Sequence, residues 1–309
     1  MKKLHTLSAA TMMIAALGLT GCTVEPESAS SEAPSDGAQA ESEIVLETNQ
    51  ELHDALPEDI KDAGTIVAVN SGSFPPYTVI DSNNELSGAT AEVGEAIGQI
   101  LGVEIEHNTV DGLASVLAGM DAGRFDLDLG PVGDYEERHA QATFIDWVQE
   151  YVVFAVEKGN PESITGLESV CGTSIAVQAG GSAERVIKEQ SDKCVEEGKE
   201  PVDVQSYKDQ PSSVLAVQSS RADAFFSSQA PLTYFVEQSD GALELAGTGK
   251  SNGFDDILQG ALVPKGSPLE DTMLEAFKIL FDSGRYEEIM TEYGLEGNMI
   301  EAPGLNMGS

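Results

Sequence analysis

Short apolar runs alternate with helix-periodic stretches from Gly64 onward, and this alternation constrains the fold more than any other feature of the sequence. Residues 65–70 (TIVAVN), 103–107 and 125–129 are typical of strands, and the stretches at 90–101 and 112–122 repeat apolar residues with a helical period. A strand–helix–strand order favours mostly parallel sheets flanked by helices. We therefore expect an α/β fold.

A second unit of the same kind follows, which predicts two lobes. Residues 151–157 (YVVFAVE) form the long apolar run expected of a strand that crosses between lobes, and 258–263 resembles a return crossing. Two lobes joined by two hinge crossings predict a cleft in which a small ligand binds. We place lobe 1 at 63–153, lobe 2 at 154–255, and the return to lobe 1 with a C-terminal tail at 256–309. In lobe 2 we expect strands at 174–178, 202–207 and 222–227, and helices at 182–194 and 211–219.

Residues 1–21 have the pattern of a lipoprotein signal peptide. Lys2 and Lys3 precede an apolar run at 7–19 that is shorter than the roughly 20 residues of a transmembrane helix. The sequence Leu-Thr-Gly-Cys at 19–22 resembles the lipobox of bacterial lipoproteins, which are cut before the cysteine and lipidated on its thiol. We expect export and anchoring to the outer face of the cell membrane through Cys22, with an ordinary secretory signal as the alternative.

The chain carries 53 acidic and 16 basic side chains, a formal net charge of −37. Contacts to phosphates need clustered Lys and Arg, so this balance argues against nucleic-acid binding. Residues 22–62 are predicted to be an acidic flexible tether, with a short helix near 51–60 and an acidic recognition tail as the alternative. Acidity of the lobes favours the approach of cationic or zwitterionic ligands.

The three cysteines divide by position. With Cys22 in the lipobox, Cys171 and Cys194 most simply form one disulfide in an oxidising exterior. Free thiols or zinc ligands are the alternatives, but the four histidines are scattered and the sequence has no CxxC. We expect no metal site and no cofactor.

Four stretches in order resemble the family-3 extracellular solute-binding proteins, the amino-acid receptors of ABC importers. They are 73–77 (SFPPY) through 86–88 (LSG), then 117–126 (LAGMDAGRFD) followed by Arg138 and Phe144, then 171–182 (CGTSIAVQAGGS), and finally 261–266 (ALVPKG) with 282–289 (DSGRYEEI). The resemblance covers roughly residues 64–297. It implies a two-lobed fold that closes over its ligand by a hinge motion, with ABC transporter permease subunits as partners. We expect a monomer.

The resemblance also implies how an amino acid is held. The family's arginine falls on Arg138, whose guanidinium can bind a carboxylate through two parallel hydrogen bonds; a surface ion pair is the alternative. The family's stacking aromatic falls on Phe74, for which core packing is the alternative. Backbone groups from Gly130 to Gly133, and amides of Gly180, Gly181 and Ser182 at a helix N-terminus, would complete a carboxylate site.

Ser228 departs from the family pattern, because the family has an aspartate there for the ligand ammonium. Three explanations stay open: Asp111, Asp128 or Asp134 supplies the charge, the ligand lacks a primary amine, or the alignment shifts near Ser228. Asp128 lies in the alternation FDLDL, which is typical of a strand with one solvated face.

Other classes of function remain alternatives. A cage for a quaternary ammonium would use cation–π attraction from Phe74, Tyr77, Tyr135, Trp147 and Phe225. An enzyme on the same fold, with dehydratase-like chemistry, needs an acid of raised pKa in the cleft. The sequence has no Ser/His/Asp set or nucleotide-binding loop. We favour a non-enzymatic, lipid-anchored binding component of an ABC importer for a polar amino acid or related amine-bearing solute.

Overall fold

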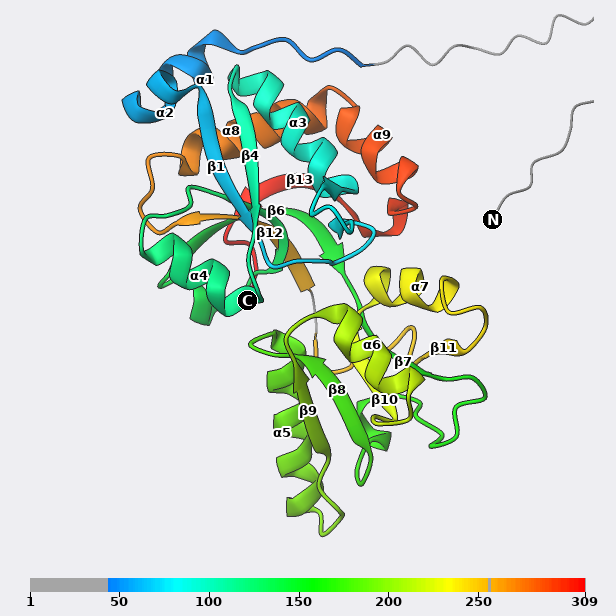
Figure 1. Ribbon diagram of the computed structural model, residues 1–309. Helices are drawn as coiled ribbons and strands as arrows, with labels where there is room; N and C mark the ends of the chain where they lie inside the picture. Colours follow the sequence, from blue (N-terminus) through cyan, green and yellow to red (C-terminus); the bar gives the residue numbers. More distant parts are fainter. Residues whose placement is uncertain (1–43, 255–256, 309) are drawn as a thin grey trace, which may run out of the picture. The chain divides into compact units, whose positions relative to one another are not determined.

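The computed structural model describes residues 44–254 and 257–308 (Figure 1). The predicted signal peptide and the lipidation site at Cys22 lie outside the described residues. No described helix combines the length and the apolar character needed to cross a membrane.

The described part of lobe 1 has two main sheets and a short antiparallel pair, β2–β3. Strand β1 pairs with β4 in parallel, and a four-stranded sheet has the order β13-β6-β12-β5. Helix α3 packs against α8 and α9 (Figure 1). The main core contains the fully buried Trp147. The elements are β1 (Thr65–Asn70), β2 (Val79–Ile80), β3 (Leu86–Ser87), α3 (Ala89–Leu101), β4 (Glu104–Thr109), α4 (Leu113–Asp121), β5 (Asp128–Gly133), η1 (Glu136–Arg138), β6 (Ala142–Glu150), β12 (Ile257–Pro264), α8 (Glu270–Asp282), α9 (Arg285–Glu292), η3 (Glu296–Asn298) and β13 (Met299–Leu305).

Lobe 2 contains one five-stranded sheet of order β11-β7-β10-β8-β9. Strands β10, β8 and β9 run parallel, whereas β7 is antiparallel to both of its neighbours. Its elements are β7 (Val152–Glu157), η2 (Leu167–Ser169), β8 (Ser174–Gln178), α5 (Ser182–Glu196), β9 (Asp203–Tyr207), α6 (Gln210–Gln218), β10 (Ala224–Ser228), α7 (Gln229–Glu237) and β11 (Leu243–Ala246). The lobe therefore begins with β7, directly after Tyr151.

The α/β, two-lobed fold is confirmed, but the expectation of mostly parallel sheets is wrong. Both lobes have mixed strand directions, and β12 is antiparallel to β5 and to β6. The reason is the connectivity. Strand β6 carries the chain out of lobe 1 and β12 brings it back, so these neighbours must run in opposite directions.

Residues 44–62 belong to the folded unit, so the predicted tether does not reach residue 62. Helices α1 (Gln50–Ala55) and α2 (Glu58–Ala63) occupy the place of the short helix expected near 51–60. The Asn49 amide donates to the Ile100 carbonyl at 2.8 Å, and Leu56 and Ile60 are buried in the lobe 1 core. Burial of these two apolar side chains offsets the conformational entropy that the segment loses on ordering. The acidic composition alone had predicted an extended segment.

A glycine fixes the loop that leads into α3. Gly88 has φ of +96°, and a Cβ at this position would lie 2.5 Å from the Tyr77 carbonyl oxygen. Only glycine tolerates both conditions, so the backbone can approach closely enough for Thr90 N–H to donate to the same carbonyl at 2.9 Å. This turn holds the preceding segment, including Phe74 and Thr78, beside lobe 1.

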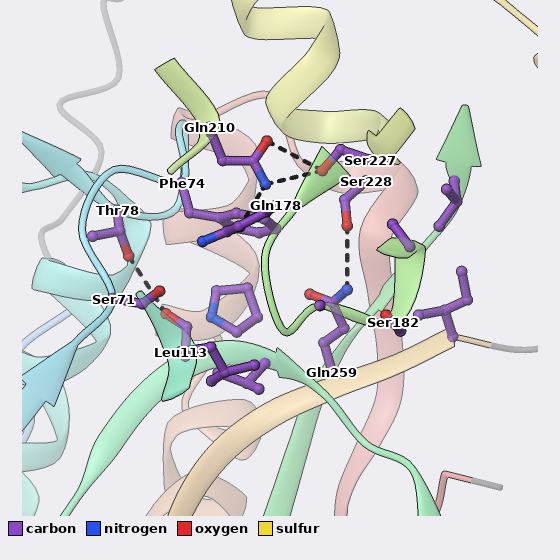
Figure 2. Close-up of a pocket in the computed structure, with 18 of the residues that line it drawn as sticks. Ser71, Phe74, Thr78, Leu113, Gln178, Ser182, Gln210, Ser227, Ser228 and Gln259 are labelled. Carbon is purple, nitrogen blue, oxygen red and sulfur yellow. Dashed lines mark hydrogen bonds between the residues drawn. The ribbon is translucent and has the colours of Figure 1, made fainter. Parts of the chain in front are cut away.

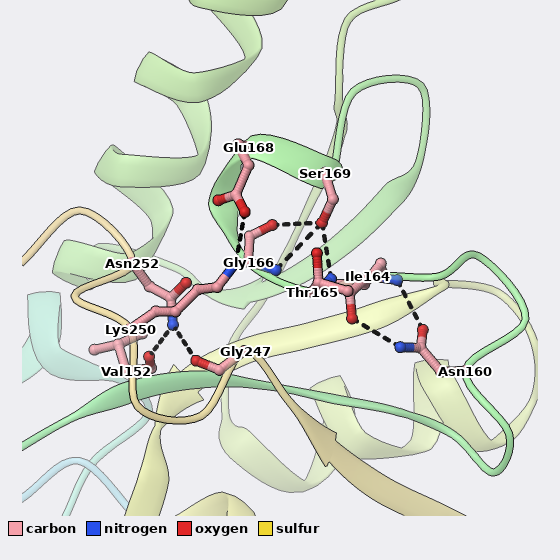
Figure 3. A network of polar contacts seen from close by, with 10 residues as sticks. All are labelled: Val152, Asn160, Ile164, Thr165, Gly166, Glu168, Ser169, Gly247, Lys250 and Asn252. Atoms are coloured by element: carbon pink, nitrogen blue, oxygen red, sulfur yellow. Dashed lines mark hydrogen bonds and ion pairs between the residues drawn. The ribbon is translucent and has the colours of Figure 1, made fainter.

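A disulfide and two hydrogen bonds of Asn252 stabilise lobe 2. The disulfide between Cys171 and Cys194 is confirmed and joins the segment before β8 to α5. Asn252, in the chain returning to lobe 1, donates to the carbonyls of Val152 at 2.7 Å and Gly247 at 2.8 Å (Figure 3). The return segment is therefore bonded to the first residue of β7, next to the first crossing.

Candidate functional site: a cleft between the two lobes

A cleft is lined by residues of both lobes and of the crossing strands (Figure 2). Lobe 1 contributes the segment 71–78 and strand β5, whereas lobe 2 contributes the ends of β8 and β10 and the start of α5. Gln259 comes from the returning strand β12. Ligands of α/β proteins bind outside the carboxyl ends of strands, and β5, β8 and β10 end at this cleft.

Arg138 connects the two lobes at one end of the cleft. Its Nη1 donates to the Gly133 carbonyl of lobe 1 at 2.7 Å, and its Nη2 donates to the Gly180 carbonyl of lobe 2 at 3.3 Å. The guanidinium also lies over the Tyr135 ring, 5.1 Å from its centroid. Among the described residues Arg138 has no ion pair, and neighbouring Glu137 lies near Arg185 instead.

The guanidinium remains charged and keeps donors for a ligand. Burial lowers the pKa of Arg138 from its ordinary value, but an arginine does not lose its proton in proteins near neutral pH. It has five N–H donors, and the two carbonyls occupy only part of this set. The remaining N–H groups can bind a carboxylate.

The N-terminus of α5 adds backbone donors to the same end of the cleft. Gly181, Ser182 and Ala183 line the cleft at the start of this 15-residue helix. Unpaired N–H groups and the helix dipole favour an anion there. The Gly180 amide is already used, because it donates to Glu184 Oε2 at 2.7 Å.

Most of the predicted ligand-binding residues come together at the cleft. Those that line it are Phe74, Gly130, Gly133, Tyr135, Arg138, Gly181, Ser182 and Ser228. Two of the others lie elsewhere: Tyr77 is fully buried and donates to Glu150, and Asp111 is exposed and pairs with Lys208 at 3.3 Å. Gly180 contributes its carbonyl to Arg138 rather than an amide to the cleft.

The five aromatic residues considered for a quaternary-ammonium cage do not all line the cleft. Phe74 and Tyr135 line the cleft. Trp147, Phe225 and Tyr77 are fully buried in the cores of the lobes. Their side chains stabilise the fold and cannot surround a ligand in the cleft.

The three acids considered as ammonium partners have different environments. Asp128 lines the cleft and is 2% exposed, so the solvated face expected from FDLDL is wrong. Every residue of its strand, β5, is buried. Burial raises the pKa of the Asp128 carboxyl from 3.8 to about 7. Asp134 is buried outside the cleft lining, where it pairs with His139 and accepts from the Gly308 amide at 2.7 Å.

An amide and hydroxyl network in lobe 2 was not predicted. The Gln210 side-chain amide donates to Gln178 Oε1 at 3.0 Å and to Ser227 Oγ at 2.9 Å (Figure 2). Gln178 and Ser227 stand at or near the carboxyl ends of β8 and β10, and Gln210 begins α6. The position of polar residues at strand ends was the available signal.

Gln259 is a further residue that sequence reasoning missed. Its Nε2 donates to Ser228 Oγ at 3.3 Å, while its buried Oε1 has no partner among the described residues (Figure 2). In the β12–β5 ladder Gln259 stands opposite Gly133, whose carbonyl holds Arg138. An unused acceptor therefore belongs to a residue that lines the same cleft, on the strand beside Gly133.

The comparisons with known proteins show the family to which the chain belongs. The model for bacterial extracellular solute-binding proteins, family 3, matches residues 66–296, and the chain belongs to this family. It is 28% identical over 268 residues to the arginine-binding protein ArgT of Corynebacterium glutamicum, which covers 85% of each chain. It is 23% identical over 197 residues to the L-cystine-binding protein TcyJ of Escherichia coli K12, covering 63% of this chain and 70% of the relative.

A solved structure supports the fold. A mutant of ArgBP from T. maritima superimposes with a TM-score of 0.67 at 21% identity, covering 79% of this chain and all of that one.

The described part of the present chain holds no cluster of side chains suited to a metal ion.

Proposed function

We propose that this chain is the lipid-anchored substrate-binding component of an ABC importer and that it binds an amino acid in the interlobe cleft. The single observation that carries the proposal is the position of Arg138. Its guanidinium is held by one carbonyl from each lobe and still has donors for a ligand.

The α-carboxylate would bind at the Arg138 end of the cleft. The guanidinium and the backbone N–H groups at the start of α5 supply donors from both lobes. Charge-assisted hydrogen bonds of this kind are roughly twice as strong as neutral ones. A carboxylate bound there would favour closure, because it joins lobe 1 to lobe 2.

The α-ammonium would bind beside it, at Gln259 Oε1 and Ser228 Oγ. Leaving a buried acceptor without a partner costs roughly 1–3 kcal/mol, so a ligand N–H that reaches Gln259 Oε1 removes an existing penalty. Two neutral acceptors would thus replace the family's aspartate. An amino acid with a free α-ammonium remains compatible with Ser228.

The physiological setting follows from the N-terminal sequence and the family. Lipidation at Cys22 would hold the protein at the outer face of the membrane, where permease subunits can contact both lobes. The relatives ArgT and TcyJ are an arginine-binding and an L-cystine-binding protein, which supports an amino acid as the transported solute.

Asp128 is the reason why an enzyme on the same fold is tested as the alternative function. It is the raised-pKa acid in the cleft that dehydratase-like chemistry would need. A ligand that is bound and returned unchanged favours the receptor, whereas a ligand that is converted favours the enzyme. Mass spectrometry of the recovered ligand distinguishes the two.

The proposal is tested by a thermal-shift screen with L-amino acids, betaines and polyamines. We expect at least one L-amino acid to raise the melting temperature, because a ligand that binds only the native state stabilises it by mass action. Betaines lack N–H donors for Gln259 and should give smaller shifts. If no amino acid shifts the melting temperature, the proposed function is wrong.

A further inference from the structure

A carboxylate faces the cleft at some distance from Arg138. Asp128 Oδ1 accepts from the Gly130 amide at 2.8 Å. Its Oδ2 accepts no hydrogen bond among the described residues, although the residue is buried and lines the cleft. Of the described residues that line the cleft, Asp128 is the one carboxylic acid.

The strand register gives the backbone separation between Asp128 and Gly133, whose carbonyl accepts from Arg138. In the β12–β5 ladder Gly133 stands opposite Gln259, and Asp128 stands opposite Leu262. These positions are three residues apart on β12, so at roughly 3.3 Å per residue they are about 10 Å apart. Because the pairing is irregular, the segment of β5 from Asp128 to Gly133 covers the same distance with more residues.

This backbone separation favours a ligand group other than the α-ammonium as the partner of Asp128 when Arg138 holds the α-carboxylate. The two α-groups of one amino acid are attached to the same carbon atom. A group at the end of an extended ligand side chain fits a site at that separation. The apolar side chains of Phe74, Leu113 and Val132 line the cleft and can cover the methylene groups of such a side chain.

We propose that Asp128 binds a terminal ammonium or guanidinium on the ligand side chain, so that the cleft selects amino acids with a long cationic side chain. The inference rests on the proposed function, because it uses Arg138 as the anchor for the α-carboxylate. It also answers part of the question raised by Ser228: the charged partner acts on the side chain, and neutral acceptors serve the α-ammonium.

Binding of the cation should release a proton. Strands β1 and β12, which flank β5, carry no ionisable side chain, and Arg138 and Tyr135 are the other ionisable groups that line the described cleft. On the adjacent helices, Glu92 of α3 bonds Arg285 and Tyr293, while Glu95 of α3 and Asp121 of α4 are exposed. Burial is therefore the dominant influence on the Asp128 carboxyl, and a bound cation favours its ionised form.

The test is calorimetric titration with L-arginine, L-lysine and their uncharged counterparts L-citrulline and L-norleucine. The expected result is that the cationic member of each pair binds more tightly. The variant Asp128→Asn should weaken binding of the cationic ligands about 10- to 100-fold while leaving L-citrulline within a few-fold. Asn keeps an oxygen for the Gly130 amide, and Asp121→Asn, at the exposed end of α4, is the matched control.

Proton release is the second measurement. Titrations at pH 7 in two buffers with different ionisation enthalpies should show release of about half a proton with L-arginine, and none with Asp128→Asn. Affinity for L-arginine should rise from pH 5.5 to 8 in the wild-type protein and stay level in the variant.

The outcomes separate this inference from the proposed function. If neutral amino acids bind as tightly as cationic ones, or if Asp128→Asn leaves the preference for L-arginine intact, the role of Asp128 is wrong and the amino-acid receptor stands. If no amino acid binds, both are wrong. Retained binding of L-citrulline by Asp128→Asn shows that the variant is folded and assigns its loss of L-arginine binding to the missing charge.

Discussion

The Tyr77 hydroxyl donates a 2.7 Å hydrogen bond to Glu150 Oε1, and this contact joins lobe 1 to the first crossing. Glu150 is the last residue of β6, and its Oε2 accepts from the amides of Tyr151 at 3.3 Å and Ala230 at 3.5 Å. Ala230 lies in the first turn of α7 in lobe 2. One buried carboxylate therefore contacts both lobes at the hinge.

The stability of the empty protein should decrease as the pH rises, partly because of Glu150. Burial raises the pKa of its carboxyl from 4.5 to about 7. The native state then holds a proton that the unfolded chain has released, so this stabilisation is complete below pH 4.5 and is lost as the pH rises through 7. Burial also raises the pKa values of Asp128 and Asp146, and the neighbouring Asp134 raises that of Asp146 further.

Glu150→Gln tests this contribution. Urea unfolding at several pH values measures how far the free energy of unfolding falls between pH 5 and pH 8. We expect this fall to be about 3 kcal/mol smaller in Glu150→Gln than in the wild type. Glu162→Gln, at an exposed position, should keep the wild-type pH dependence. An unchanged slope in Glu150→Gln would mean that the hinge carboxyl titrates normally.

Removing the disulfide should destabilise lobe 2. The bond between Cys171 and Cys194 closes a loop of 23 residues, and the loss of such a constraint costs about 3 kcal/mol. We expect Cys171→Ser/Cys194→Ser to unfold at lower urea concentration. Thiol titration of the unreduced, unfolded wild-type protein should detect neither cysteine. Two reactive thiols would contradict the pairing.

Replacing Gln259 should weaken ligand binding at the α-ammonium. Gln259→Leu removes the acceptor Oε1 and leaves only Ser228 Oγ, so we expect about tenfold weaker binding of every amino acid that binds. Gln238→Leu, on the surface after α7, is the control. Equal affinities of both variants, measured by calorimetry, would remove Gln259 from the site.

Periodicity predicted most of the elements because their signals are local. The strand expected at 65–70 is β1, the strand at 174–178 is β8, and the helix at 90–101 is α3 with one additional residue. Strand direction is not a local property, so the antiparallel pairing of β12 could not be read from its apolar run. The packing of α1 and α2 likewise depends on a distant surface of α3.

The site was predicted at positions to which the family pattern assigns a role and missed at positions to which it assigns none. Arg138 and Ser182 occupy motif positions, and both line the cleft. Gln178, Gln210 and Gln259 have ordinary polar side chains in ordinary contexts, and only the fold brings them together. Asp128 is the instructive case, since alternation predicts a solvated residue and the cover over both faces of β5 makes it a buried one.

The central claim is that Arg138 binds the α-carboxylate of an amino acid, and calorimetric titration of Arg138→Ala tests it most directly. The ligand is the amino acid that gives the largest thermal shift, and Arg124→Ala, an exposed arginine after α4, is the matched control. Loss of charge-assisted hydrogen bonds to a carboxylate should weaken binding about 100-fold in Arg138→Ala, with no change in Arg124→Ala. Wild-type affinity in a folded Arg138→Ala protein would contradict the account.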